Sequence, residues 1–242
     1  MLVRVPIREY DEVVSLITRD FGRVDALAKG VKKIKSKLSA HLEPFSYVSF
    51  DTVEGKEMSV LTVAQSLESF LGTRSHYIKS LQAEFASHAL YRLTRPGNLE
   101  YGVFDLFSTW LRTLNTVEYI VDCRYLDWFM LQLMSAIGFE PHYAACVNCG
   151  RTEELSFWSF FQGGAVCQSC ASDKSSTDSL FRISSQTLVD LSRLHCISPT
   201  DLFSAPAFGL GTHSVLTGHL QYQTEAKIGN WGHTYVPTEQ LA

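Results

Sequence analysis

Four of the six cysteines in this 242-residue chain fall into two C-x2-C pairs. The first pair is Cys146 and Cys149, and the second pair, Cys167 and Cys170, follows after seventeen further residues. A tight turn aims both sulfurs of such a pair at one point, and two pairs at this spacing are typical of a tetrahedral zinc site. We expect one structural Zn²⁺ per chain, because a closed shell of four thiolates leaves no position for water or substrate.

The alternative for these cysteines is two disulfides or four ordinary buried thiols. Disulfides require an oxidising compartment, and the first residues of the chain do not resemble a secretory signal. The longest apolar stretch, residues 126–139, contains Asp127 and Gln132 and is shorter than the roughly 20 residues that span a bilayer. We therefore expect a cytoplasmic protein without a membrane partner, in which Cys123 and Cys196 are small core residues.

An enzyme interpretation has little support in the sequence. His41-Leu42-Glu43 and the first cysteine pair resemble the zinc ligands of nucleobase deaminases. However, Ala145 stands where that motif has proline, the two pieces lie over a hundred residues apart, and the second cysteine pair would have no role. Phosphate-binding, nucleophile-elbow and dinucleotide-binding glycine motifs are absent, and the remaining histidines show no metal-ligand spacing. We predict a protein that is not an enzyme.

Positive charge is concentrated in one short segment. The net charge of the chain is −4, which argues against a protein that coats nucleic acid through its overall charge. Between residues 23 and 41, in contrast, six basic residues accompany a single acid, Asp25. The basic residues are Arg23, Lys29, Lys32, Lys33, Lys35 and Lys37. This segment predicts a local surface for nucleic acid, and the alternative is a solvated loop that only keeps the protein soluble.

The first 70 residues have the pattern of β structure. Five short runs of β-branched and aromatic residues are separated by turn residues, at 2–7, 13–18, 23–28, 45–50 and 59–63. Five strands in so short a segment favour a small barrel, because closure removes the exposed sheet edges. The lysine-rich segment then becomes the long loop between the third and fourth strands.

From residue 72 onward the apolar residues follow helical spacing. Three helices are predicted before Gly138, and the third is apolar on nearly all sides, which indicates a central position in a bundle. The four-cysteine module follows, with a hairpin near residues 155–161 and a polar linker at 172–179. Ser184 or Ser185 is expected to cap another helix, a last helix is expected near 213–226, and the tail at 227–242 shows no period.

Taken in order, these segments resemble the RecO family of bacterial DNA repair proteins. The resemblance covers most of residues 1–200 and rests on the order and spacing of several short motifs. The motifs are Arg8-Glu9-Tyr10-Asp11-Glu12, residues 16–23, Ala28-Lys29-Gly30-Val31-Lys32-Lys33, Leu42-Glu43-Pro44-Phe45, and Gly138-Phe139-Glu140-Pro141 leading into Cys146-Val147-Asn148-Cys149-Gly150.

The resemblance implies an α+β multidomain architecture. An oligonucleotide/oligosaccharide-binding (OB) barrel is expected at 1–71, followed by the first part of a helical domain at 72–138. The four-cysteine zinc module is expected at 139–180, and the second part of the helical domain with the tail at 181–242. The metal ligands would be Cys146, Cys149, Cys167 and Cys170, and DNA contacts would come from Arg23 and the five lysines.

The same resemblance implies a recombination mediator without catalytic turnover. Such a protein binds single- and double-stranded DNA, promotes annealing, engages RecR and the single-strand binding protein, and thereby helps to load RecA. It would be located in the bacterial cytoplasm at the nucleoid. The alternative function is a zinc-ribbon adaptor that binds only proteins.

Overall fold

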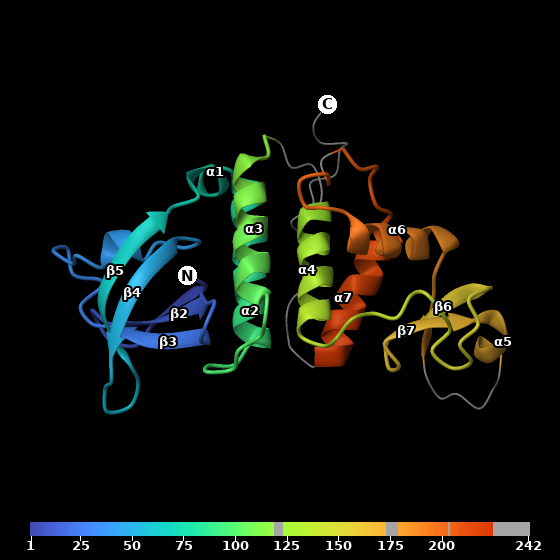
Figure 1. Cartoon of the computed structure of the whole chain (residues 1–242), viewed down its shortest axis with the longest axis horizontal. Coiled ribbons are helices and arrows are strands. Elements are labelled where there is room, and N and C mark those ends of the chain that lie inside the picture. Colours follow the sequence, from blue (N-terminus) through green and yellow to red (C-terminus); the bar gives the residue numbers. More distant parts are fainter. Residues whose placement is uncertain (119–122, 173–178, 203, 225–242) are drawn as a thin grey trace. The chain divides into compact units, whose positions relative to one another are not determined.

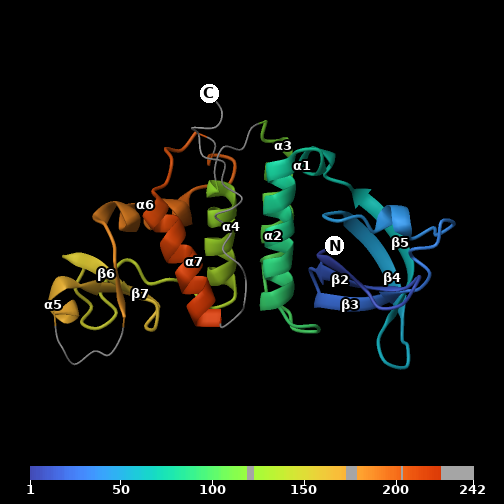
Figure 2. The same cartoon turned by 180° about the vertical axis from the view of Figure 1, so that it is seen from behind.

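The structure, a computed structural model, describes all residues except 119–122, 173–178, 203 and 225–242. These residues form two compact units, Met1–Glu118 and Tyr119–Ala242. Figures 1 and 2 show the elements of each unit from opposite sides. The first unit contains the strands β1 to β5 together with the helices α1 to α3. The predicted domain boundaries at residues 71, 138 and 180 stay a prediction.

The five predicted strands are present in the first unit. They are β1 (Val3–Pro6), β2 (Glu12–Thr18), β3 (Gly22–Ala28), β4 (Tyr47–Val53) and β5 (Val60–Glu68). The strands form one sheet in the order β1-β2-β3-β5-β4, in which β3 and β5 are parallel and the other pairs are antiparallel. The side chains that face inward form a buried cluster, which includes Val14, Leu16, Ala26 and Leu61. The sheet therefore has the strand arrangement of an OB-fold.

The sheet is not a closed barrel, and the expectation of closure was wrong in this respect. Strands β1 and β4 are its two edges, and the described residues show no ladder between them. Strand β1 is short and ends at Pro6, which has no backbone N–H to donate. Two hydrogen bonds instead link β1 and the residues before it to the segment that leads into β4: the Met1 amine donates to the Ser46 carbonyl at 2.8 Å, and Arg4 Nη1 donates to the Leu42 carbonyl at 3.1 Å.

Three α-helices complete the first unit, namely α1 (Leu71–Arg74), α2 (Tyr77–Leu93) and α3 (Val103–Thr116), and a short 3-10 helix, Ser39–His41, precedes β4. The apolar side of α3 lies against the sheet, where Phe107 and Leu111 line the same cavity as Leu16. Two ion pairs support this packing, with Arg19 2.6 Å from Asp105 and Arg112 3.0 Å from Glu68. The spacing of apolar residues thus correctly predicted both long helices.

The second unit is organised around α4 (Arg124–Ala136). This helix contacts α6 (Ser185–Cys196) and α7 (Leu210–Thr224). The prediction of a central helix is confirmed, because α4 buries residues on nearly all of its sides. The helix also forms a side-chain hydrogen bond within this unit, in which Trp128 Nε1 donates to the Ile197 carbonyl at 2.9 Å. As predicted, Ser184 caps α6 by accepting a hydrogen bond from the Thr187 N–H.

The predicted tail at 227–242 lies outside the described residues, as does most of the predicted linker at 172–179. Among the helices of the described ranges, none combines the length and the apolar character that a membrane span requires.

Candidate metal centre and nucleic-acid interface

The first cysteine pair is held by a tight turn. The Cys146 N–H donates to the Arg151 carbonyl, and the Gly150 N–H donates back to the Cys146 carbonyl, both at 2.8 Å. Gly150 has a φ of +73°, a backbone conformation that glycine adopts without a steric penalty. This turn brings the sulfur of Cys149 to the same side as that of Cys146.

The second pair is positioned by a strand and a short helix. The predicted hairpin is confirmed as β6 (Leu155–Ser159) and β7 (Gly164–Cys167), so Cys167 ends a strand, and Cys170 lies in α5 (Gln168–Ala171). Strand β8 (Leu180–Arg182) pairs with the other side of β6. The sequence analysis missed β8, because a run of three residues carries almost no periodic signal.

The strand β7 lies close to the segment around the first cysteine pair at Gly164. A Cβ atom on this residue would lie 2.5 Å from both the His142 carbonyl oxygen and Val147 Cγ1. Only glycine therefore allows the β7 strand to lie against the segment that leads into the first cysteine pair. The Val147 N–H donates to the Ala165 carbonyl at 2.9 Å, which joins the two halves of the module.

The four predicted ligands converge. Their sulfur atoms all lie within 4.8 Å of one another, and the Sγ atoms of Cys149 and Cys167 are 3.7 Å apart. A tetrahedral ion with Zn–S bonds of about 2.3 Å would separate its sulfurs by about 3.8 Å. Cys146 and Cys167 are buried, Cys149 is exposed and Cys170 is half-buried. The cluster can therefore hold a metal ion.

The protonation of the thiols also fits a bound cation. Burial raises the pKa of Cys146, but the backbone N–H groups of Cys167, Cys149 and Asn148 outweigh it and lower the pKa to about 6. Hydrogen bonding to the sulfurs of Cys149 and Cys167 raises the pKa of Cys170 to about 12. Cys170 therefore keeps its proton at neutral pH, and a divalent cation would supply the charge that favours its thiolate.

His219 on α7 connects this helix to the chain that enters the module. Its Nε2–H donates to the Phe139 carbonyl at 2.8 Å, and its ring lies 6.0 Å from that of Trp158. Burial lowers the pKa of His219 below its usual 6.5, although the bond to Phe139 opposes this effect. The residue is therefore neutral in the folded chain at pH values where the unfolded chain would bind a proton.

This difference predicts a loss of stability in acid. As the pH falls below 6.5, protonation of His219 in the unfolded chain should lower the free energy of unfolding by up to about 1.4 kcal/mol per pH unit. Urea unfolding of the second unit at several pH values, with zinc in excess, measures the slope. His219→Gln keeps an N–H donor and should flatten it, whereas parallel curves for the two proteins would contradict the assignment.

The predicted lysine-rich loop joins β3 to β4, as expected. Lys29, Lys32, Lys33, Lys35 and Lys37 are all exposed. Between and after them, Val31 and Leu42 are completely buried in the core of the sheet, and Leu38 packs against it. These apolar residues attach the loop to the sheet, so that the lysines are held at its surface.

The turn between β1 and β2 supports the same loop. The Gly30 N–H donates to Asp11 Oδ1 at 2.7 Å, and the Lys32 N–H donates to the Tyr10 carbonyl at 3.2 Å. The Lys33 ammonium lies 5.6 Å from the centre of the Tyr10 ring, a cation–π contact. An aromatic ring therefore lies beside the lysines, although the two segments are twenty residues apart.

Two residues of this surface were missed by the sequence analysis. Tyr10 is 45% exposed, and Ile34, between Lys33 and Lys35, is fully exposed. An exposed ring and an exposed apolar side chain among lysines are the features with which proteins stack on or wedge between bases. The sequence did contain a signal for Ile34, namely an apolar residue within a run of lysines. It contained none for Tyr10, which belongs to this surface only because the fold places it beside Lys33.

Arg23 lies apart from the five lysines. It is 9% exposed, and its guanidinium donates to the carbonyls of Tyr91 and Thr94 at the end of α2 and forms an ion pair with Asp25 at 3.1 Å. Its charge is thus used inside the first unit, where it joins β3 to α2. The five lysines are the members of the predicted DNA-binding set that the structure presents to solvent.

The other sequence predictions have mixed outcomes. His41, from the deaminase-like motif, accepts a hydrogen bond from the Ser66 N–H at 3.3 Å, and it lies in the unit that does not contain the cysteines. Cys196 is exposed at the end of α6, so its assignment to the core was wrong. Cys123 is half-buried and contacts two polar side chains that are described below.

The chain thus combines an OB-type sheet that carries a lysine loop with a helical unit that carries an inserted four-cysteine module. Residues 1–70 match the family model "Recombination protein O N terminal", and residues 74–228 match "Recombination protein O C terminal". The chain belongs to the Recombination protein O (RecO) family.

Similar proteins carry the same family name. The chain is 30% identical to "DNA repair protein RecO" of Dehalococcoides mccartyi strain CBDB1 over 164 residues, which are 67% of this chain and 64% of the relative. It is 28% identical to the Syntrophomonas wolfei protein of that name over 188 residues, or 77% of this chain and 73% of the relative. The chain thus spans slightly under two thirds of the Dehalococcoides relative.

Proposed function

We propose that the chain acts in DNA repair as a DNA-binding recombination mediator. In this role it binds single- and double-stranded DNA, promotes annealing, and helps to load RecA onto strands coated by the single-strand binding protein. The observation that carries the proposal is the lysine loop, in which five exposed lysines are held beside an exposed tyrosine on an OB-type sheet. Membership of the RecO family supports it.

The expected mode of DNA binding follows from these side chains. Lysine ammonium groups contact phosphates without reading base sequence, and an aromatic ring stacks on any base. Five phosphate contacts to a single strand predict a log–log salt slope of about −3.5, using about −0.7 per phosphate. Affinity should therefore depend steeply on salt and only weakly on sequence.

The four-cysteine site and the helical unit have separate roles in this proposal. We assign Zn²⁺ to the four-cysteine site, where it would stiffen the module without taking part in a reaction. The helical unit is the proposed contact for the single-strand binding protein, and RecR is a further expected partner. Simultaneous binding of the strand and of the protein that coats it raises the local concentration of each, without requiring new contacts. The protein would act in the bacterial cytoplasm at the nucleoid.

The first experiment is a fluorescence-anisotropy titration of a labelled single-stranded oligonucleotide at several salt concentrations, with zinc measured on the same sample. The mediator predicts tight, strongly salt-dependent binding and at least one zinc ion per chain, held by the four cysteines of the module. If zinc is present and DNA binding is absent even at low salt, the protein-only adaptor is the better assignment.

Tyr10 provides a separate test of the stacking contact. Loss of one stacked base costs about 1–3 kcal/mol, so Tyr10→Ala should weaken single-strand binding by about 5- to 150-fold. Tyr10→Phe keeps the ring and should bind like the wild type. The two variants are compared by anisotropy at one salt concentration, and an equal loss in both would exclude stacking as the role of this residue.

A further inference from the structure

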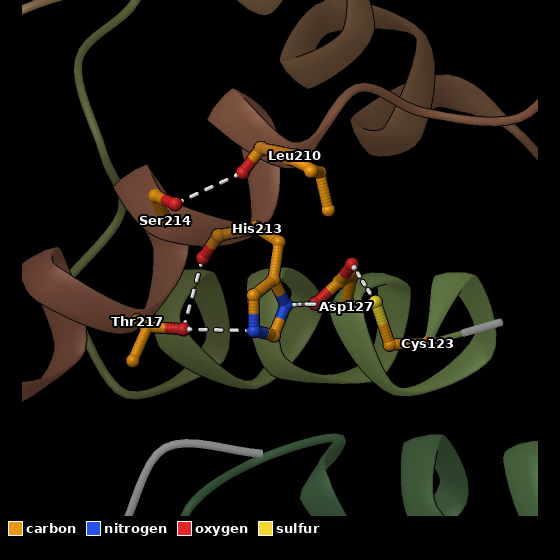
Figure 3. A network of polar contacts seen from close by, with 6 residues as sticks. All are labelled: Cys123, Asp127, Leu210, His213, Ser214 and Thr217. Carbon is orange, nitrogen blue, oxygen red and sulfur yellow. Dashed lines mark hydrogen bonds and ion pairs between the residues drawn. The ribbon is translucent and has the colours of Figure 1, made fainter. Parts of the chain in front are cut away.

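A second cluster of potential metal ligands lies in the helical unit, and it uses none of the four cysteines of the module. Cys123 precedes the first residue of α4, Asp127 lies one turn further along the same helix, and His213 lies in the first turn of α7. Figure 3 shows the thiol, the carboxylate and the imidazole pointing toward one another between the two helices.

The distances in this cluster are short. Cys123 Sγ donates to Asp127 Oδ2 at 3.1 Å and lies 3.5 Å from His213 Nδ1. His213 Nδ1 is 2.8 Å from Asp127 Oδ1. The side chain of Asp127 is 3% exposed and that of His213 is 12% exposed. A carboxylate buried to this extent requires a compensating positive charge or hydrogen bonds.

The geometry distinguishes a metal site from a nucleophilic thiol. In a thiol–histidine–carboxylate relay, the nucleophile and the carboxylate bind opposite nitrogens of the imidazole. Here both face Nδ1, whereas Nε2 lies 3.5 Å from the Thr217 hydroxyl, which itself donates to the His213 carbonyl at 2.9 Å. The imidazole therefore cannot pass a proton from the thiol to the carboxylate. The thiol, the carboxylate and Nδ1 instead surround one point, as the ligands of a metal ion do.

The ligand types and separations fit a borderline-soft divalent ion. Thiolate, imidazole and carboxylate are the three side-chain ligands of Zn²⁺. Bonds of about 2.3 Å to sulfur and about 2.05 Å to nitrogen place these two atoms about 3.6 Å apart in a tetrahedral site, close to the 3.5 Å found here. The carboxylate lies closer to both partners than the roughly 3.4 Å to nitrogen and roughly 3.6 Å to sulfur of such a site, and it faces them with different oxygens, Oδ1 and Oδ2, because hydrogen bonds hold the three groups together. An ion would replace the protons of these bonds and require only a small shift of Asp127.

We propose that Cys123, Asp127 and His213 form a second metal site, for Zn²⁺ or a similar transition-metal ion, that fastens α7 to α4. The three side chains supply three ligands, and a four-coordinate ion takes its remaining ligand from solvent or from a bound molecule. The site would join two helices across 90 residues of sequence. It is independent of the proposed role in DNA repair.

The test is a Co²⁺ titration of the full chain after its four-cysteine site has been filled with Zn²⁺. Visible absorption bands of tetrahedral cobalt with a thiolate ligand should appear and saturate at one further equivalent per chain. Cys123→Ser and His213→Gln should lose these bands, whereas Cys196→Ser should keep them. Titration that ends without cobalt bands, or bands that persist in folded Cys123→Ser protein, would overturn the proposal.

A second measurement needs no variant of the buried residues. Alkylation of each cysteine in the wild-type chain is followed by mass spectrometry with and without the added ion. Occupancy should slow alkylation of Cys123 at least tenfold and leave the exposed Cys196 unchanged. If both thiols react at the same rates with and without the ion, the site does not exist, whatever the variants show.

Discussion

Replacing Cys167 with serine is expected to remove the metal from the module and unfold it locally. Cys167 is completely buried, and its backbone N–H donates to Cys146 Sγ at 3.4 Å, so it belongs to both the ligand set and the core of the module. Structural zinc contributes about 10–16 kcal/mol of apparent binding energy, which is comparable with the roughly 5–15 kcal/mol stability of a whole domain. The small core around the cysteines cannot replace such a contribution.

The measurements are zinc content per chain and limited proteolysis with mapped cleavage sites. Zinc should fall by one equivalent per chain, and new cuts should appear between residues 140 and 172. Cys196→Ser is the matched control, because this exposed cysteine lies outside the cluster. Unchanged zinc and an unchanged cleavage pattern in Cys167→Ser would remove the metal hypothesis. Single-strand affinity should stay within about threefold of the wild type, since the lysine loop belongs to the other unit.

The second large effect is expected from the lysine loop. In the triple variant Lys32→Glu, Lys33→Glu and Lys35→Glu, three proposed phosphate contacts become repulsive. The salt slope should fall from about −3.5 to about −1.4, and affinity at low salt should drop by more than a hundredfold. Between 50 and 200 mM salt the wild type should lose affinity by about 130-fold and the variant by only about 7-fold.

The control for this variant has the same change in net charge at another place. Lys56, Arg92 and Arg95 are exposed residues of the same unit that lie outside the loop. Replacing all three with glutamate should preserve most of the affinity and the slope of the wild type. If both triple variants lose DNA binding equally, the loop has no special role and overall charge explains the interaction. If neither loses it, the lysines are a solvated surface and the adaptor function gains support.

Several features of this protein follow from the sequence by itself. The C-x2-C spacing predicted that the two sulfurs of each pair lie close together, because the geometry of four consecutive residues is a local property. The alternation and the helical spacing of apolar residues predicted the five strands and the long helices, since a buried face must repeat with the period of its element. The same pattern also placed the lysine run between the third and fourth strands, because the run lies between the third and fourth of the five β-type segments in chain order.

Other features were decided only by the tertiary structure, because they depend on residues that are distant in sequence. Arg23 is adjacent to the lysine run in sequence, but β3 carries it to the end of α2, where its charge is buried. Tyr10 comes beside Lys33 through the packing of two loops, and His213 meets Cys123 and Asp127 through the packing of α7 on α4. Spacing along a chain describes only short-range geometry, whereas a site built from separate elements exists only after their apolar faces have packed together.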